Sequence, residues 1–147
     1  MIIRNMQEKD LSQVAEIEKL IFSQPWSEKS FRDSIKDENN VYICVEVDGV
    51  IAGYCGIWNV AGEGQVNNVA VHPLYRNKGI AYQMLQYAID ICNKKGTDSY
   101  TLEVRKNNEY AIRLYEKLGF IDCGIRKNFY DCPKEDAIIM WINPPCI

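Results

Sequence analysis

Residues 69–81 read VAVHPLYRNKGIA, and this stretch leads from an apolar, strand-like run into an amphipathic, helix-like run. Gly79 allows the backbone to turn tightly, so the free N–H groups and the positive dipole end of the following helix face outward together. Arg76 and Lys78 add positive charge there, and the small Ala81 leaves room for an anion. The stretch predicts a phosphate-binding connection. An ordinary strand-to-helix turn with solvated basic residues remains the alternative, since neither the P-loop nor the dinucleotide-binding pattern is present.

The segments on either side alternate between strand-like and helix-like patterns. Upstream, two apolar runs flank Asp48-Gly49, a pair that favours a tight hairpin because both turn positions need a positive φ. The pattern predicts strands near residues 1–4, 41–47, 50–58, 65–71, 100–104, 120–126 and 137–142, and helices near residues 11–21, 27–35, 80–92 and 108–118. The expected fold is an α/β (α+β) domain of three layers, in which a mixed, mostly antiparallel sheet of about seven strands is flanked by four helices.

Two helix starts carry capping signals in the sequence. Asp10-x-x-Gln13 predicts a capping box that opens the first helix, because each side chain reaches a backbone N–H group of the other residue. Ser27 predicts the N-cap of the second helix. These signals set the expected boundaries of the two helices that precede the main sheet.

Length and composition restrict the class of protein. The chain has 147 residues, a hydrophobic fraction of 47% and a net charge of −3, which indicates one globular domain spanning residues 1–147. The excess of acidic over basic residues argues against direct nucleic-acid binding by phosphate neutralisation. Apolar runs are too short for a membrane span, and residues 1–5 do not resemble a secretory signal, so we expect a cytoplasmic protein that binds no membrane.

The cysteines do not indicate a metal site or a disulfide framework. Six cysteines are scattered without a C-x-x-C pair, and His72 is the only histidine. We therefore expect free thiols and no bound metal. His72 directly precedes Pro73 at a strand end, where a structural or solvated role is favoured over a role as catalytic base.

The loop also carries a family resemblance. Arg76-x-x-Gly79-x-Ala81 matches the Q/R-x-x-G-x-G/A signature of the GCN5-related N-acetyltransferases (GNAT), whose order of elements is the one expected here. The resemblance implies that acetyl-coenzyme A is the co-substrate and that this loop binds its pyrophosphate. It implies coenzyme contacts at Val69, Ala70, Val71, Arg76, Asn77, Lys78, Gly79, Ile80, Ala81, Asn108, Ala111 and Tyr115.

A second stretch narrows the resemblance within the family. Residues 101–120, TLEVRKNNEYAIRLYEKLGF, resemble the LEVR, SN-x-x-A and ALYE-x-LGF run of the bacterial ribosomal-protein-alanine acetyltransferases, the RimI group. Residues 25–28 (PWSE), 126–130 (RKNFY) and 135–140 (EDAIIM) match it as well. Asn107, Phe129 and Ala81 depart from the residues common in relatives, and Phe129 is the departure expected to alter the peptide groove.

The candidate catalytic residues are Glu103 and Tyr115. Acetyl transfer to an amine needs a base for the amine, donors for the oxyanion and a proton for the departing thiolate. Glu103 near the end of a central strand is the expected base, Tyr115 the expected acid, and backbone N–H groups of residues 69–71 the oxyanion donors that the resemblance implies. Without the resemblance, Glu103 would be interpreted as a partner of Arg105 or Arg113, and Tyr115 as a packed aromatic residue.

Three other residues also carry expectations, and two of them have two interpretations. Asn108 is expected to cap the helix that follows it, and the resemblance adds a contact to the coenzyme arm. Trp26 forms either a wall of the peptide groove or a hydrophobic anchor between helices. Tyr130 reaches the substrate end of the site on the resemblance alone.

The resulting hypothesis is an acetyltransferase that acts through a ternary complex on the N-terminal amine of a protein, most specifically the N-terminal alanine of small-subunit ribosomal protein eighteen. A basic protein N-terminus suits a chain of net charge −3. The expected state is a monomer or weak dimer. The alternatives are acetylation of a lysine side chain or a small-molecule amine, and a non-catalytic coenzyme-A-binding scaffold or sensor.

Overall fold

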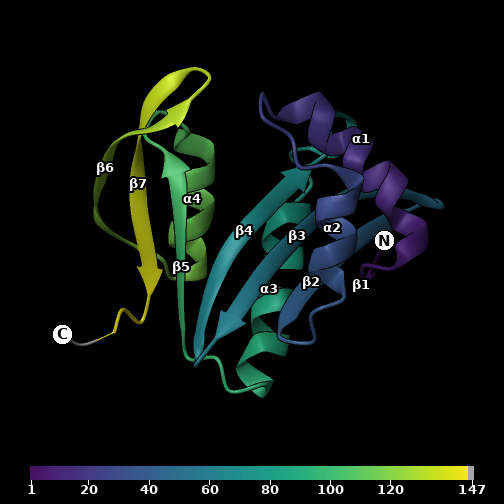
Figure 1. Ribbon diagram of the computed structural model, residues 1–147, viewed down its shortest axis with the longest axis horizontal. Helices are drawn as coiled ribbons and strands as arrows, with labels where there is room; N and C mark the ends of the chain where they lie inside the picture. Colours follow the sequence, from purple (N-terminus) through teal and green to yellow (C-terminus); the bar gives the residue numbers. More distant parts are fainter. Residues whose placement is uncertain (146–147) are drawn as a thin grey trace.

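The computed structural model describes residues 1–145, and its centre is a seven-stranded sheet in the order β1-β2-β3-β4-β5-β7-β6 (Figure 1). All neighbouring strands are antiparallel except β4 and β5. The elements in chain order are β1 (Ile2–Asn5), α1 (Leu11–Ile21), α2 (Glu28–Ile35), β2 (Asn40–Val47), β3 (Val50–Val60), β4 (Glu63–Val71), α3 (Ile80–Lys94), β5 (Ser99–Arg105), α4 (Glu109–Leu118), β6 (Ile121–Asp131) and β7 (Lys134–Ile142), with short 3-10 turns at Glu8–Asp10 and Pro73–Tyr75. The predicted three-layer fold and element order are confirmed.

The helices cover the two faces of the sheet in pairs. On one face, Met84 and Leu85 of α3 pack with Tyr115 of α4 over the strands. On the other face, Val14 of α1 and Phe31 of α2 pack over β2 and β3. Because strand side chains alternate between faces, neighbouring buried residues such as Ile43 and Cys44 of β2 belong to different cores.

The sheet opens between β4 and β5. These parallel strands pair only at Glu63↔Ser99, Gly64↔Tyr100 and Gln65↔Thr101. Beyond these pairs the strands diverge, as Figure 1 shows between the teal β4 and the green β5. The carboxyl ends of both strands therefore border a gap, where ligand sites of open sheets lie.

Most local signals in the sequence correspond to the structure. Asp48 and Gly49 have φ values of 49° and 81° in the β2–β3 hairpin. The Ser27 hydroxyl accepts a hydrogen bond of 3.1 Å from the Ser30 N–H, which confirms the predicted N-cap. Gly119 ends α4 in the left-handed region, at φ 105°.

The predicted capping box at Asp10-x-x-Gln13 is wrong. The Asp10 carboxylate instead accepts the Gln7 N–H at 2.8 Å and pairs with Arg4 at 2.8 Å. The Gln13 amide oxygen accepts the Ile51 N–H of β3 at 3.0 Å. Both side chains are engaged by tertiary partners, which local spacing does not encode.

Phe31 is the central side chain of the α1–α2 core. It is fully buried, and its ring lies 5.3 Å from that of Trp26 and 5.6 Å from that of Tyr54. We expect Phe31→Ala to lower the free energy of unfolding by about 3–5 kcal/mol, because truncation leaves a cavity among rigid rings. Urea unfolding checks this, with Phe129→Ala, at an exposed ring, as the control. A loss below about 1 kcal/mol for Phe31→Ala would contradict the expectation.

Three further findings concern the described part of the chain. No helix there is long and apolar enough to cross a membrane. No three His, Cys, Asp or Glu side chains among residues 1–145 are grouped so as to hold a metal ion. Cys44, Cys55 and Cys92 are buried free thiols, and burial raises the pKa of Cys44 to about 12. Cys123 and Cys132 are exposed free thiols, and Cys146 lies outside the described residues.

Candidate active site

A cavity of about 370 Å³ lies between the sheet and the helices α3 and α4. Its lining brings together residues of the stretch 69–81 and of α4, which are far apart in the sequence. Of the residues for which the family resemblance implies coenzyme contacts, eleven line this cavity: Val69, Ala70, Val71, Arg76, Asn77, Gly79, Ile80, Ala81, Asn108, Ala111 and Tyr115. Lys78 does not line it, and its ammonium group lies 5.8 Å from the ring centre of Tyr75.

The loop before α3 has the conformation that its glycine permits. Gly79 is the N-cap of α3 at φ 75°, and Asn77 is also left-handed at φ 63°. The first N–H groups of α3 have no partner within the helix, so they are available to an anion at this end. Arg76 is tethered beside them, because its Nε donates to the Val71 carbonyl at 3.1 Å.

His72 has a structural role at the start of this loop. Its Nδ1 accepts the Leu74 N–H at 3.1 Å and caps the 3-10 turn Pro73–Tyr75. His72 does not line this cavity, and it does not line the cavity on the other side of the sheet opening. This placement agrees with the interpretation of His72 as a structural residue.

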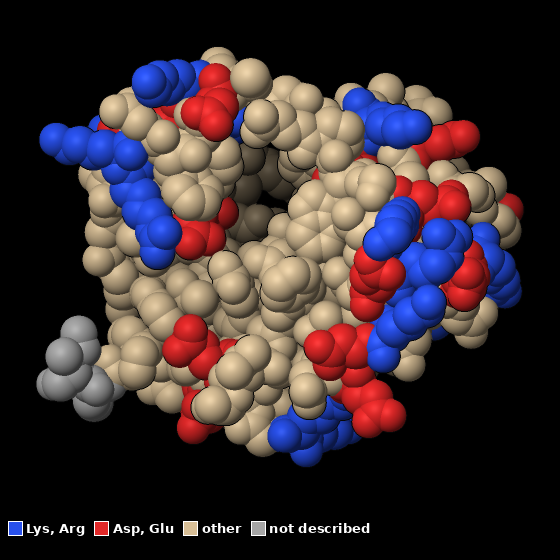
Figure 2. Space-filling model, viewed as in Figure 1, with Lys and Arg blue, Asp and Glu red and all other residues tan. Residues whose placement is uncertain are grey.

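A second cavity, of about 530 Å³, lies on the opposite side of the sheet opening. The face in Figure 2 is hollowed here, and most of the side chains around the hollow are uncharged, while charged side chains gather on the outer parts of the face. Glu103, Trp26 and Tyr130 line this cavity, and they come from β5, the α1–α2 loop and β6. The two cavities share Ile21, Phe22, Val69, Asn108 and Tyr115, so they adjoin at the opening between β4 and β5.

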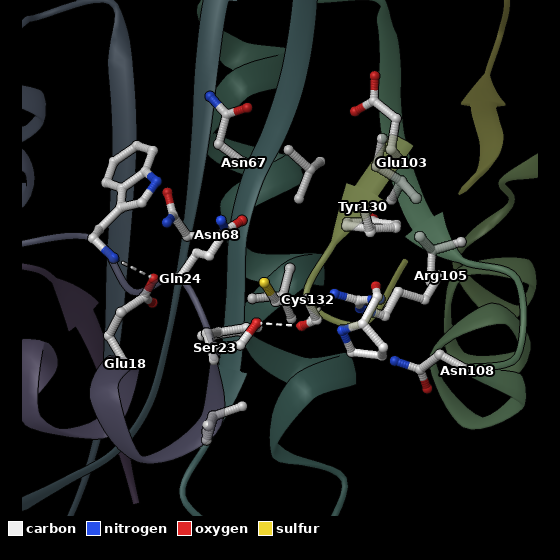
Figure 3. A pocket seen from close by; sticks show the side chains of 18 of the residues that line it. Glu18, Ser23, Gln24, Asn67, Asn68, Glu103, Arg105, Asn108, Tyr130 and Cys132 are labelled. Carbon is white, nitrogen blue, oxygen red and sulfur yellow. Dashed lines mark hydrogen bonds between the residues drawn. The ribbon is translucent and has the colours of Figure 1, made fainter. Parts of the chain in front are cut away.

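Glu103 lies on the wall of the second cavity, and its carboxylate is only partly engaged by other side chains. Its side chain is 18% exposed, and the closest cation is the Arg126 guanidinium at 3.9 Å. The alternative partner Arg105 instead pairs with Glu135 at 3.2 Å and stacks on Tyr130 at 4.3 Å. Glu103 is therefore available to a group that enters the cavity (Figure 3).

Tyr115 lies where the two cavities meet. It projects from α4, is buried, and packs edge-on against Phe120 with ring centres 5.9 Å apart. Burial raises the pKa of the Tyr115 phenol, with a smaller contribution from Tyr130. The hydroxyl therefore carries its proton at neutral pH, and the ring packs as the packed-aromatic interpretation predicts.

Trp26 packs against other aromatic rings and also lines the second cavity. Its ring packs against Phe31 and lies 5.9 Å from the ring of Trp58, which anchors the α1–α2 loop. The same residue forms part of the second cavity. Tyr130 also lines that cavity, and burial followed by the charge of Glu103 raises its pKa to about 12. Phe129, which was expected to alter the groove, is 43% exposed and does not line the cavity.

Comparison with known proteins decides the family. The sequence profile of the acetyltransferase (GNAT) family matches residues 11–120. The chain belongs to the GNAT acetyltransferase family.

Relatives within this family are similar over nearly their whole length. A Bacillus subtilis protein, provisionally named a ribosomal protein bS18-alanine N-acetyltransferase, is 40% identical over 96% of this chain and 94% of its own. The Escherichia coli ribosomal protein bS18-alanine N-acetyltransferase is 36% identical over 94% of each chain. A crystal structure of the ribosomal-protein-S18-alanine N-acetyltransferase from Escherichia coli superimposes with a TM-score of 0.87, at 35% identity, over 96% of this chain and 92% of that one.

Several lining residues of this GNAT site were not predicted from the sequence. Glu18 is buried on the cavity wall, where its carboxylate accepts the Tyr54 hydroxyl at 2.6 Å and the Trp26 N–H at 3.0 Å (Figure 3). Burial raises the pKa of Glu18, and these two hydrogen bonds oppose the shift. Glu18 lies four residues after Val14 on the apolar stripe of α1, and that position was a usable signal of burial.

Asn67 and Asn68 of β4 are also lining residues that the sequence did not single out. Neither residue carries a local signal, because their placement depends on an irregularity in the pairing of β3 and β4. Ser23 was missed as well. Its hydroxyl donates to the Cys132 carbonyl and joins the α1–α2 loop to the β6–β7 hairpin beside the cavity (Figure 3).

The left-handed glycine at the start of α3 provides a test of whether the first cavity binds the coenzyme. We expect Gly79→Val to raise the KM for acetyl-coenzyme A at least about tenfold, because a β-branched residue at φ 75° shifts the loop and its N–H groups. The KM for the acceptor should change little. Gly49→Val is the matched control, since Gly49 has φ 81° in the β2–β3 hairpin. Equal effects of the two substitutions on the coenzyme KM would contradict the assignment of the loop.

Proposed function

We propose that this GNAT acetyltransferase transfers acetyl from acetyl-coenzyme A to the N-terminal α-amine of a protein, specifically the N-terminal alanine of ribosomal protein bS18. The observation that carries the proposal is the pair of adjoining cavities, with Tyr115 between them and Glu103 in the second. The identity of 36% and 40% with relatives named for bS18-alanine acetylation supports this acceptor. A ribosomal acceptor would place the reaction in the cytoplasm.

The residues of the first cavity fit a pyrophosphate-bearing thioester. The start of α3, its left-handed Gly79 and the tethered Arg76 offer N–H donors and positive charge to a pyrophosphate. Acetyl-coenzyme A would supply the activated acyl group, as it does for the GNAT family. Residues 66–71 of β4 have no pairing with β5, so their backbone groups on that side could hold the pantetheine arm and polarise the thioester carbonyl.

The proposed chemistry assigns one proton to each of two side chains. Glu103 accepts a proton from the acceptor amine, directly or through a water molecule, as the amine nitrogen bonds to the acetyl carbonyl carbon. The C–S bond then breaks, and Tyr115 donates its proton to the departing sulfur. An α-amine has a pKa of about 7.7–8.0 and lysine about 10.4, so the demand on the base is smaller for an N-terminus.

Mass spectrometry of acetylated peptides tests the acceptor. The protein and acetyl-coenzyme A are incubated with a peptide that begins Ala-Arg-Tyr, and with the same peptide blocked at its N-terminus and carrying an internal lysine. We expect acetyl only on the free alanine. Acetyl on the blocked peptide would replace the proposal with a lysine acceptor. Coenzyme binding without transfer to either peptide would overturn the protein acceptor.

A further inference from the structure

The irregular pairing of β3 and β4 places two consecutive side chains on the second cavity. Asn68 pairs with Gly56 and Val66 pairs with Ile57, so Asn67 has no partner on β3 and forms a β-bulge. A bulge interrupts the alternation of faces, which allows neighbouring residues to point the same way. Asn67 and Asn68 both line the cavity that Glu103 lines.

A chain of two hydrogen bonds fixes the amide of Asn68. The Trp58 Nε1–H donates to the Tyr42 hydroxyl at 2.9 Å, and the Tyr42 hydroxyl donates to the Asn68 Oδ1 at 2.8 Å. The indole N–H is only a donor, so it uses an acceptor site of the hydroxyl, whose proton goes to Asn68. This direction places the oxygen of the Asn68 amide toward Tyr42. Its Nδ2 group has no hydrogen-bond partner among residues 1–145.

The anchor of this amide is rigid. A side chain at Gly56 would overlap the ring of Tyr42, so β3 packs directly on that ring, and Phe31 packs edge-on against it at 6.4 Å. The ring of Trp58 lies 5.9 Å from that of Trp26. Asn68 is 5% exposed. The amide is therefore oriented before any ligand arrives, which lowers the entropic cost of binding to it.

We propose that Asn68 binds the acceptor peptide by donating a hydrogen bond from Nδ2 to one of its first three backbone carbonyl oxygens. This inference rests on the proposed function, since it requires a peptide acceptor. A neutral amide donor in a mostly uncharged cavity matches a carbonyl, which every peptide presents whatever its side chains. In Figure 3 Asn68 lies on the wall opposite Arg105 and Tyr130, so a chain lying between these walls passes beside it.

Thioamide peptides test the hydrogen bond. Sulfur in place of a carbonyl oxygen weakens the acceptor while keeping the length and charge of the peptide. The Ala-Arg-Tyr peptide is prepared with a thioamide at the first, second or third residue, and kcat/KM is compared with that of the oxo-peptide. With the wild-type protein, we expect one position to lower kcat/KM about fivefold to tenfold. With Asn68→Ala, the oxo/thio ratio at that position should fall to about one.

A second pair of variants keeps the test valid if Asn68→Ala folds poorly. Tyr42→Phe removes the hydroxyl that orients the amide and keeps the ring, so the ratio at the same position should fall to about half or less. Tyr54→Phe is the matched control, because this hydroxyl lies in the same aromatic core but binds Glu18, and its ratio should equal that of the wild type.

The outcomes separate the inference from the proposed function. A wild-type protein that does not acetylate the oxo-peptide overturns the function and the inference together. Normal acetylation with oxo/thio ratios that are equal in the wild type and in both Asn68→Ala and Tyr42→Phe overturns the inference alone. A ratio lost in those two variants and kept in Tyr54→Phe supports it.

Discussion

Glu103→Gln is expected to lower kcat about 100-fold with the Ala-Arg-Tyr peptide and to leave acetyl-coenzyme A binding unchanged. The amide cannot accept the proton of the acceptor amine, and general-base catalysis contributes at least about 100-fold in typical enzymes. The loss should shrink as pH rises above the pKa of the α-amine, about 7.7–8.0, because the amine is then already deprotonated. Steady-state kinetics between pH 6.5 and 9.5 measure both effects.

Glu63→Gln is the control for this variant. Glu63 is an exposed carboxylate at the other end of β4, where that strand pairs with β5, and its replacement should leave kcat within about twofold. A Glu103→Gln protein that binds the coenzyme normally and transfers acetyl as fast as the wild type would refute the assignment of the base. So would a loss of the same size at every pH.

Tyr115→Phe is the second large effect, with an expected loss of kcat also near 100-fold. Phenylalanine keeps the packing on Phe120 and removes only the hydroxyl, so the free energy of unfolding should change little. A thiolate of pKa about 8.5 leaves readily without help, which places the effect at the low end for acid catalysis.

The pH dependence gives an independent check of Tyr115. Because burial raises the pKa of this phenol, it keeps its proton throughout the usual assay range, and no loss of wild-type activity below pH 10 should come from its ionisation. Tyr87→Phe on the exposed side of α3 is the control. Unaltered kcat in Tyr115→Phe would refute the role of Tyr115 as acid and leave packing as its only role.

Local chemistry explains which parts of the fold could be predicted from the sequence. Asp48-Gly49 and Ser27 each act within a few residues, and each occurs in the structure where its pattern placed it. The capping box predicted at Asp10 and Gln13 is absent because their side chains bind Arg4 and Ile51, which are 6 and 38 residues away in the chain. A spacing rule cannot compare a local cap with a stronger tertiary partner.

In the candidate site too, local patterns could be predicted from the sequence and tertiary contacts could not. The stretches 69–81 and 101–120 were identified separately, and the structure brings them to one opening in the sheet. The bulge at Asn67 could not be predicted, because it is a shift in the pairing register of β3 and β4, and register depends on both strands. The orientation of Asn68 depends in turn on Tyr42 and Trp58 from two other strands.

The short pairing of β4 with β5 links ligand binding to the stability of the fold. Only three residue pairs join these strands, so this is the shortest strand pairing in an otherwise continuous sheet. Ligands that filled the gap would supply contacts that neighbouring strands provide elsewhere. Because they bind the folded chain alone, saturation at about 100 times Kd would add about 2.7 kcal/mol to the free energy of unfolding. The protein is thus most resistant to unfolding, and to proteases that cleave unfolded chains, while it holds its substrates.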